Sequence, residues 1–263
     1  NNFYDNENII FELNNNLLSG MKLPSKSYVT FDLTFKYIDG AIVSKETSSL
    51  NSYIRFNFDS VAILKSTSST DTTAFRSSTY KTKIKNITFE DKINIPKTAI
   101  ESWDIGVSQT GDVMAYVVNN ASDENYYDLY IQSDTQLYAN ENMSYWFSNF
   151  IAVESVNKLE VMNTANTTNM TSMFYRLGKS SKTFELDVTS LETSSVLSMD
   201  AMFYETGYSS TGFTLDLKNF NTSNVTSMSA MFYYTGYTSS KLTLDLTNFD
   251  TSKVTNMNSM FNN

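Results

Sequence analysis

The feature that most constrains the fold is a repeat of 29 residues in the second half of the chain. Its clearest marker is a Met-Phe pair that recurs without insertion or deletion at Met173-Phe174, Met202-Phe203, Met231-Phe232 and Met260-Phe261. The segments that begin at Phe184, Phe213 and Leu242 are also alike along their length. Self-similarity at a fixed period of this size indicates structural units that stack on one another.

The first part of each repeat predicts a short strand. In the second repeat, Phe213, Leu215 and Leu217 alternate with polar residues, which is the period of a strand that buries one face. The outward residues between them then form columns along the stack.

The second part of each repeat predicts a short helix. Its apolar residues fall three, three and one apart, at Val225, Met228, Met231 and Phe232. Thr222 and Ser223 are the expected N-cap, and Gly236 is the expected left-handed stop.

A single unit cannot bury its own apolar stripe, so the units are expected to stack as a solenoid with a parallel strand ladder. The predicted fold class is mainly β with short helices: a β-sandwich-like N-terminal domain followed by a leucine-rich-repeat-type solenoid with 29-residue coils. The methionine columns are read as core, with a methionine-rich binding groove as the alternative. They comprise Met199, Met228, Met257 and Met202, Met231, Met260.

Three segments are expected along the chain. Residues 1–95 contain alternating runs, among them Val29 to Phe35 and Ile54 to Phe58, and predict the β-sandwich-like domain. Residues 96–142 predict a β-hairpin that leads into the solenoid and caps it, with Trp103 as its anchor. Residues 143–263 predict the solenoid, whose first coil is atypical because Trp146-Phe147 replaces Met-Phe.

The composition excludes several function classes. Nineteen basic and 28 acidic residues give a formal charge of −9, and no basic run suggests nucleic-acid binding. The chain has no cysteine and no histidine, so we expect neither a thiolate metal site nor the commonest general base. No cofactor is expected. No apolar run has the ~20 residues that a membrane span needs.

The repeats resemble those of BspA-like bacterial surface proteins and mycoplasma surface lipoproteins, which are relatives of leucine-rich-repeat proteins. Residues 244–261, LDLTNFDTSKVTNMNSMF, carry the resemblance most clearly, and the passage from Trp103 to Ile131 resembles the segment that precedes such repeats. The resemblance covers about residues 80–263. It implies an extracellular or cell-surface, non-enzymatic module for adhesion, with a protein or glycan of a host or neighbouring cell as partner.

One candidate binding surface is the outward face of the predicted strands. Its columns contain Glu185, Thr214, Thr243, then Asp187, Asp216, Asp245, then Thr189, Lys218, Thr247. Stacked aspartates repel one another unless water or a cation screens them. The acidic column is therefore either a site for a basic partner or calcium, or a solvated face that repeat duplication has maintained.

A second candidate surface is the loop that contains the repeated glycine. Tyrosines recur there in two columns, Tyr175, Tyr204, Tyr233 and Tyr208, Tyr237. Tyrosine rings suit sugars and protein hot spots, and partial burial against the next coil is the alternative.

Two other functions remain open at this stage. One is a structural or decoration subunit of a surface appendage or virion, in which the N-terminal domain docks and the solenoid projects. The other is a glycosidase, for which Asp104, Asp112, Asp123 and Glu124 supply carboxylates without any spacing that fixes their geometry. We expect no enzymatic activity.

The last expectation concerns Val254, Met257 and Phe261, which would lie on an open end of the stack. Such an end favours further coils or self-association with a second copy.

Overall fold

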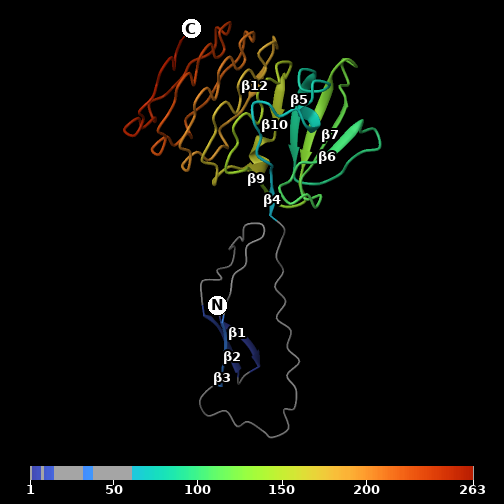
Figure 1. Ribbon diagram of the computed structural model, residues 1–263, viewed down its shortest axis with the longest axis vertical. Coiled ribbons are helices and arrows are strands. Elements are labelled where there is room, and N and C mark those ends of the chain that lie inside the picture. Colours follow the sequence, from blue (N-terminus) through green and yellow to red (C-terminus); the bar gives the residue numbers. More distant parts are fainter. Residues whose placement is uncertain (1, 7–8, 15–31, 38–60, 263) are drawn as a thin grey trace. The chain divides into compact units, whose positions relative to one another are not determined.

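The computed structural model describes residues 2–6, 9–14, 32–37 and 61–262 (Figure 1). The chain divides into two units, residues 1–59 and 60–263. In the first unit, strands β1 (Asn2–Asn6), β2 (Ile9–Asn14) and β3 (Asp32–Tyr37) form an antiparallel sheet in that order. The expected run from Val29 to Phe35 overlaps β3. The expected run from Ile54 to Phe58 lies outside the described residues.

The second unit contains a mixed six-stranded sheet of order β12-β10-β5-β8-β7-β6 and a three-stranded sheet of order β11-β9-β4. Its elements are β4 (Ala62–Ile63), η1 (Ala74–Arg76), β5 (Ile84–Glu90), β6 (Glu101–Asp104), β7 (Met114–Asn119), β8 (Tyr127–Gln132), β9 (Leu137–Tyr138), β10 (Ser155–Asn157), η2 (Leu159–Val161), β11 (Met162–Asn163) and β12 (Glu185–Leu186). The described part of the chain is thus mainly β, and its helices are the 3-10 turns η1 and η2.

The domain boundary expected near residue 95 falls inside this second unit. Strand β5 pairs in parallel with β8 on one side and with β10 on the other, so it is a central strand of the large sheet. Its apolar residues Ile84, Ile87 and Phe89 are fully buried there. β7 and β8 form the expected hairpin, with Val117 opposite Leu129.

From Asn142 onward, successive segments lie side by side in register, and we call residues 142–262 the repeat array. Parallel bridges join Asn142 to Asn169, Asn169 to Ser198, Ser198 to Ser227 and Ser227 to Asn256. Figure 1 shows these segments as adjacent windings that pass from green through yellow to red. The atypical first segment belongs to the array, because Phe147 stacks on Phe174 with ring centroids 5.4 Å apart.

The alternation predicted for each repeat is confirmed as a burial pattern. Phe213, Leu215 and Leu217 are buried and the polar residues between them are exposed. The predicted ladder is only partly present: β12 pairs with β10, but residues 213–217 and 242–246 form no strand. The hydrogen bonds that join neighbouring repeats run mainly through the Met-Phe segments instead.

The helix predicted at the Met-Phe segment is wrong. Ala201 and Glu205 have φ of 51°, which is left-handed and incompatible with a right-handed helix. The backbone N–H groups alternate: that of Met202 bonds to Met199 within its own segment, while those of Ala201 and Phe203 bond to the next segment. The apolar spacing of three, three and one therefore arises from successive turns.

Thr222 is not a helix N-cap either. Its hydroxyl donates to the carbonyl of Asp250 at 3.0 Å and accepts the N–H of the same residue at 2.8 Å. Thr193 makes the equivalent pair of bonds with Asn221. These buried threonines join neighbouring windings.

The methionines fill the core, so the groove hypothesis for them is wrong over most of the array. Met199, Met202, Met228 and Met231 have no exposed surface. Phenylalanine rings stack beside them along the array, with centroids 5.5 Å apart for Phe174 and Phe203 and 5.9 Å apart for Phe203 and Phe232. At the last winding, Met257 is 43% exposed and Phe261 is 55% exposed.

Candidate functional site

The aspartate column is present, and each of its carboxylates organises a turn. Oδ1 accepts the backbone N–H two residues later in every case: 2.9 Å from Thr189 to Asp187, 3.0 Å from Lys218 to Asp216, and 3.0 Å from Thr247 to Asp245. Such side-chain bonds stabilise the bend that follows each alternating segment. The column therefore has a structural role in the fold.

Hydrogen bonds are the main cause of lowered pKa values for the three carboxylates of this column. The hydroxyl and N–H of Thr189 lower the pKa of Asp187, the Lys218 ammonium and N–H lower the pKa of Asp216, and the N–H and hydroxyl of Thr247 lower the pKa of Asp245. The charge of Asp216 acts in the opposite direction on both neighbours, but the pKa of each still falls. All three carboxylates are thus negative at neutral pH.

The column does not converge on a metal site in the described residues, where no group of three or more acidic, histidine or cysteine side chains could hold an ion. Lys218 also pairs with the column, with its Nζ 2.9 Å from Asp216 Oδ2. The geometry therefore favours the solvated face over a calcium ladder.

Glu185 and Asp187 border a hollow of about 480 Å³ beside the first winding. Lys158 and Glu160 line its other side. Lys158 adopts a left-handed conformation with φ of 57° at the start of η2. The lining holds three carboxylates and one ammonium, so the hollow is acidic on balance.

The four carboxylates considered for glycosidase chemistry lie in two groups at opposite ends of β7. Asp104 and Asp112 flank Gly106, where Asp104 accepts backbone N–H groups and Asp112 accepts the hydroxyl of Ser108. Asp123 and Glu124 lie in the turn between β7 and β8.

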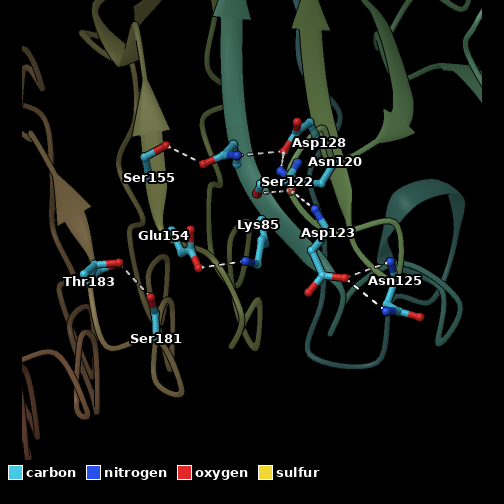
Figure 2. A network of polar contacts seen from close by, with 11 residues as sticks. Lys85, Asn120, Ser122, Asp123, Asn125, Asp128, Glu154, Ser155, Ser181 and Thr183 are labelled. Atoms are coloured by element: carbon cyan, nitrogen blue, oxygen red, sulfur yellow. Dashed lines mark hydrogen bonds and ion pairs between the residues drawn. The ribbon is translucent and has the colours of Figure 1, made fainter.

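Asp123 belongs to a network of polar contacts across neighbouring strands (Figure 2). Asp123 Oδ1 accepts the N–H and amide of Asn125, which lower its pKa. Asp128 accepts from Asn86 at 2.7 Å and from Asn120 at 2.8 Å. Figure 2 also shows the Lys85 ammonium pointing to Glu154, 3.1 Å away. These acidic groups fix the strands and the turn.

The tyrosine columns form one continuous cluster. Tyr204 lies between Tyr175 and Tyr233, with ring centroids 4.7 and 4.5 Å away, and Tyr208 stacks on Tyr237 at 5.0 Å. Tyr234 joins the two columns, because its ring meets Tyr233, Tyr237 and Tyr208 edge to face. We call these six residues, Tyr175, Tyr204, Tyr208, Tyr233, Tyr234 and Tyr237, the tyrosine cluster.

Stacking determines which parts of the tyrosine rings remain exposed for contact with a partner. Both faces of the Tyr204 ring are covered by its neighbours, so partial burial against the next winding is confirmed for this column. Tyr237, at the end of the second column, is 54% exposed. The cluster therefore presents ring edges, together with the larger surface of Tyr237.

Charged residues that the sequence analysis missed border the tyrosine cluster. Glu205 accepts from Arg176 Nε at 2.6 Å and from Lys179 Nζ at 2.7 Å. Arg176 lies over the Tyr175 ring at 5.0 Å and Lys179 over the Tyr208 ring at 5.5 Å. The sequence contains a signal for this ion pair, because Arg176 and Glu205 are 29 residues apart and so occupy equivalent places in neighbouring repeats.

Comparisons with known proteins give one match. Residues 141–263 match a family described as "Mycoplasma protein of unknown function, DUF285". No curated protein and no solved structure matches the chain. Among the residues that the structure describes, no helix combines the length and the apolar character needed to cross a membrane. The repeat array thus coincides with the part of the chain, residues 141–263, that is similar to this mycoplasma family of unknown function.

Proposed function

We propose that this chain is a non-enzymatic module of the cell surface that binds a partner protein through the tyrosine cluster. The repeat array would be a leucine-rich-repeat-type solenoid of the BspA-like kind, as the resemblance of residues 244–261 implies, and would act as the rigid support. The extracellular location is part of the same proposal.

The observation that carries the proposal is the continuity of the six tyrosines on one surface. Tyrosine is enriched at the centres of protein interfaces, because a ring buries a large area at a small cost in side-chain entropy while its hydroxyl remains paired. Ring stacking within the cluster fixes the side chains before binding, which lowers that cost further.

The same geometry favours a protein over a glycan as the partner. A sugar ring packs best on an open aromatic face, and in the Tyr204 column the faces are already used for stacking. Ring edges and hydroxyls, with the Arg176, Lys179 and Glu205 charges beside them, match the mixed surface of a protein hot spot.

The experiment probes arrays of extracellular-matrix proteins and of glycans with the intact chain, and then with the double variant Tyr233→Ser, Tyr237→Ser. The matched control is Leu197→Ser, Val107→Ser, which also removes two exposed apolar side chains, 50% and 42% exposed, at sites outside the cluster. Loss of hot-spot contacts should weaken capture of a matrix protein by about tenfold or more. Equal binding by parent and tyrosine variant, or equal loss in the control, would contradict the proposal.

A second candidate, a structural or decoration subunit of an appendage or virion, draws support from the division of the chain after Asp59. A separate N-terminal unit could dock while the array is displayed. Co-purification of the full chain in a filament or particle would favour this function over a free-standing binding module.

A further inference from the structure

Arg76, on η1, is a buried cation that packs against two neighbouring aromatic rings. Only 5% of the surface of Arg76 is exposed. The guanidinium carbon lies 4.5 Å from the centroid of Phe75 and 4.3 Å from that of Trp146. Such contacts with ring faces stabilise a cation, but they leave its N–H donors without acceptors in the guanidinium plane.

The hydrogen bonding of Arg76 is incomplete. Nε and Nη2 are buried and have no hydrogen-bond partner in the described part of the chain. Asp71 is its ion-pair partner, at 3.9 Å from Nη1, yet Oδ1 of this carboxylate is already occupied by Thr73. Burial lowers the pKa of Arg76 to about 10, so the group is still charged at neutral pH. A buried cation with free donors is costly until an acceptor reaches it.

A cavity of about 420 Å³ lies against this arginine. Lys65, Ser66, Trp103 and Trp146 are among its lining residues. The volume is within the ~300–1,000 Å³ typical of small-molecule sites. Trp103 is partly exposed, and its ring lies edge to face with Phe75 at 6.2 Å, so the cavity has an ordered aromatic wall.

The acceptors in the cavity wall do not reach the Arg76 donors: Asp71 Oδ2 stays 3.9 Å from Nη1, and the other carboxylate is bonded to backbone. Asp104, the second carboxylate of the lining, accepts the N–H of Gly106 at 2.9 Å and that of Gly111 at 2.8 Å, one on each oxygen. Lys65 adds an exposed ammonium to the rim. The unpaired donors of Arg76 therefore call for an added acceptor, and a carboxylate supplies one whose charge matches the guanidinium.

We propose that the cavity binds an acidic sugar, whose carboxylate pairs with the Arg76 guanidinium while its ring packs against Trp103. A guanidinium matches a carboxylate through two parallel hydrogen bonds, and an indole face suits the C–H face of a sugar. Because Nε and Nη2 are themselves buried, binding includes a rotation of the Arg76 side chain that turns these donors toward the cavity. This site is separate from the tyrosine cluster and does not depend on its function.

The chain provides its own probe. Trp103 and Trp146 are the two tryptophans of the sequence, and both line the cavity. Intrinsic tryptophan fluorescence of the full chain therefore reports on this site alone. It is titrated with D-glucuronate, with D-glucose as the uncharged match and with inorganic sulfate as a simple anion. The expected result is a saturable change with glucuronate and none with glucose.

Variants test the role assigned to the guanidinium. Arg76→Lys retains the charge and loses the paired hydrogen bonds, so its affinity for glucuronate should fall by about tenfold or more. Arg176→Lys, in the repeat array, is the matched control and should respond like the parent. If Arg76→Lys fails to fold, Trp103→Phe replaces it: Trp146 still reports, and glucuronate binding should weaken.

Several outcomes would overturn the proposal. These are a flat response to glucuronate, an equal response to glucose, a response to sulfate alone, and an Arg76→Lys variant that binds like the parent. A flat response would mean that water or the rings alone satisfy Arg76, which would then be a purely structural cation.

Discussion

Thr222 and Asp250, 28 residues apart, exchange two hydrogen bonds across neighbouring windings. The hydroxyl of Thr222 donates to the Asp250 carbonyl and accepts its N–H, so one buried side chain satisfies two backbone groups of the next repeat. Thr164 and Thr193 do the same for Glu192 and Asn221. A regular column of hydroxyls thus replaces strand pairing where the alternating segments are not hydrogen-bonded as a ladder.

The first prediction concerns this column. Thr222→Val keeps the shape of the side chain but removes both of its hydrogen bonds to the Asp250 N–H and carbonyl. The free energy of unfolding should fall by about 1–3 kcal/mol, measured by urea denaturation. Thr214→Val is the matched control, because Thr214 is exposed between the buried residues Phe213 and Leu215, and it should change stability by less than about 0.5 kcal/mol. Equal effects would show that the hydroxyl bridges contribute nothing.

The second prediction uses two neighbouring glycines. Gly207 has φ of 59°, and a Cβ there would lie 2.8 Å from the Phe213 ring, whereas a Cβ at Gly212 would meet no atom within 4 Å. Gly207→Ala should lower stability by more than the ~1–2 kcal/mol of a left-handed alanine, because the ring must also move. Gly212→Ala should be neutral or slightly stabilising. Equal melting temperatures for the two variants would contradict the packing described for the loop around Gly207.

The third prediction concerns pH and the aspartate column. Because the folded-state pKa of Asp216 lies below its ordinary value of 3.8, the stabilisation that it provides is fully present above that value. It is lost as the pH falls from 3.8 through the folded-state pKa. Asp187 and Asp245 behave in the same way.

The variant Asp187→Asn, Asp216→Asn, Asp245→Asn should therefore show a weaker loss of stability in acid than the parent. Asparagine Oδ1 can still accept the same N–H groups, but the negative charge that strengthens these bonds and the Lys218 pair is lost, so stability at pH 7 should be slightly lower than in the parent. Calcium should not change the melting temperature of either protein. A calcium shift in the parent that the triple variant lacks would restore the cation-site hypothesis.

The sequence predicted those features that depend on local periodicity. The alternation of Phe213, Leu215 and Leu217 gave the correct buried face, because a period of two is set by the backbone itself. The left-handed turn at Ala201 could not be found in this way, since alanine carries no signal for positive φ and three-residue spacing also fits a helix.

Contacts between segments that are distant in the sequence could not be predicted as well. Arg76 and Trp146 meet only because the fold brings η1 beside the first winding of the array, and neither residue repeats. The Arg176–Glu205 pair could have been found by aligning the repeats. The position of β5 in the large sheet depends on pairing with β8 and β10, which its own pattern does not specify.

In-register stacking of the windings is the central claim, and a disulfide tests it most directly. Thr226 and Thr255 are exposed, and the N–H of Thr255 donates to the Thr226 carbonyl at 2.8 Å. Opposed residues on neighbouring strands lie about 5 Å apart, within the range of a disulfide. The natural chain has no cysteine, so Thr226→Cys, Thr255→Cys supplies the only two thiols.

The comparison pair is Thr226→Cys, Thr243→Cys, whose members are closer in sequence but more than half a winding apart. Oxidation under native conditions, followed by mass spectrometry, measures the intramolecular disulfide in each protein. The account predicts efficient closure for Thr226 with Thr255 and little for Thr226 with Thr243. Because loop closure in a loosely ordered chain favours the shorter separation, preferential closure of Thr226 with Thr243 would contradict the stacked array.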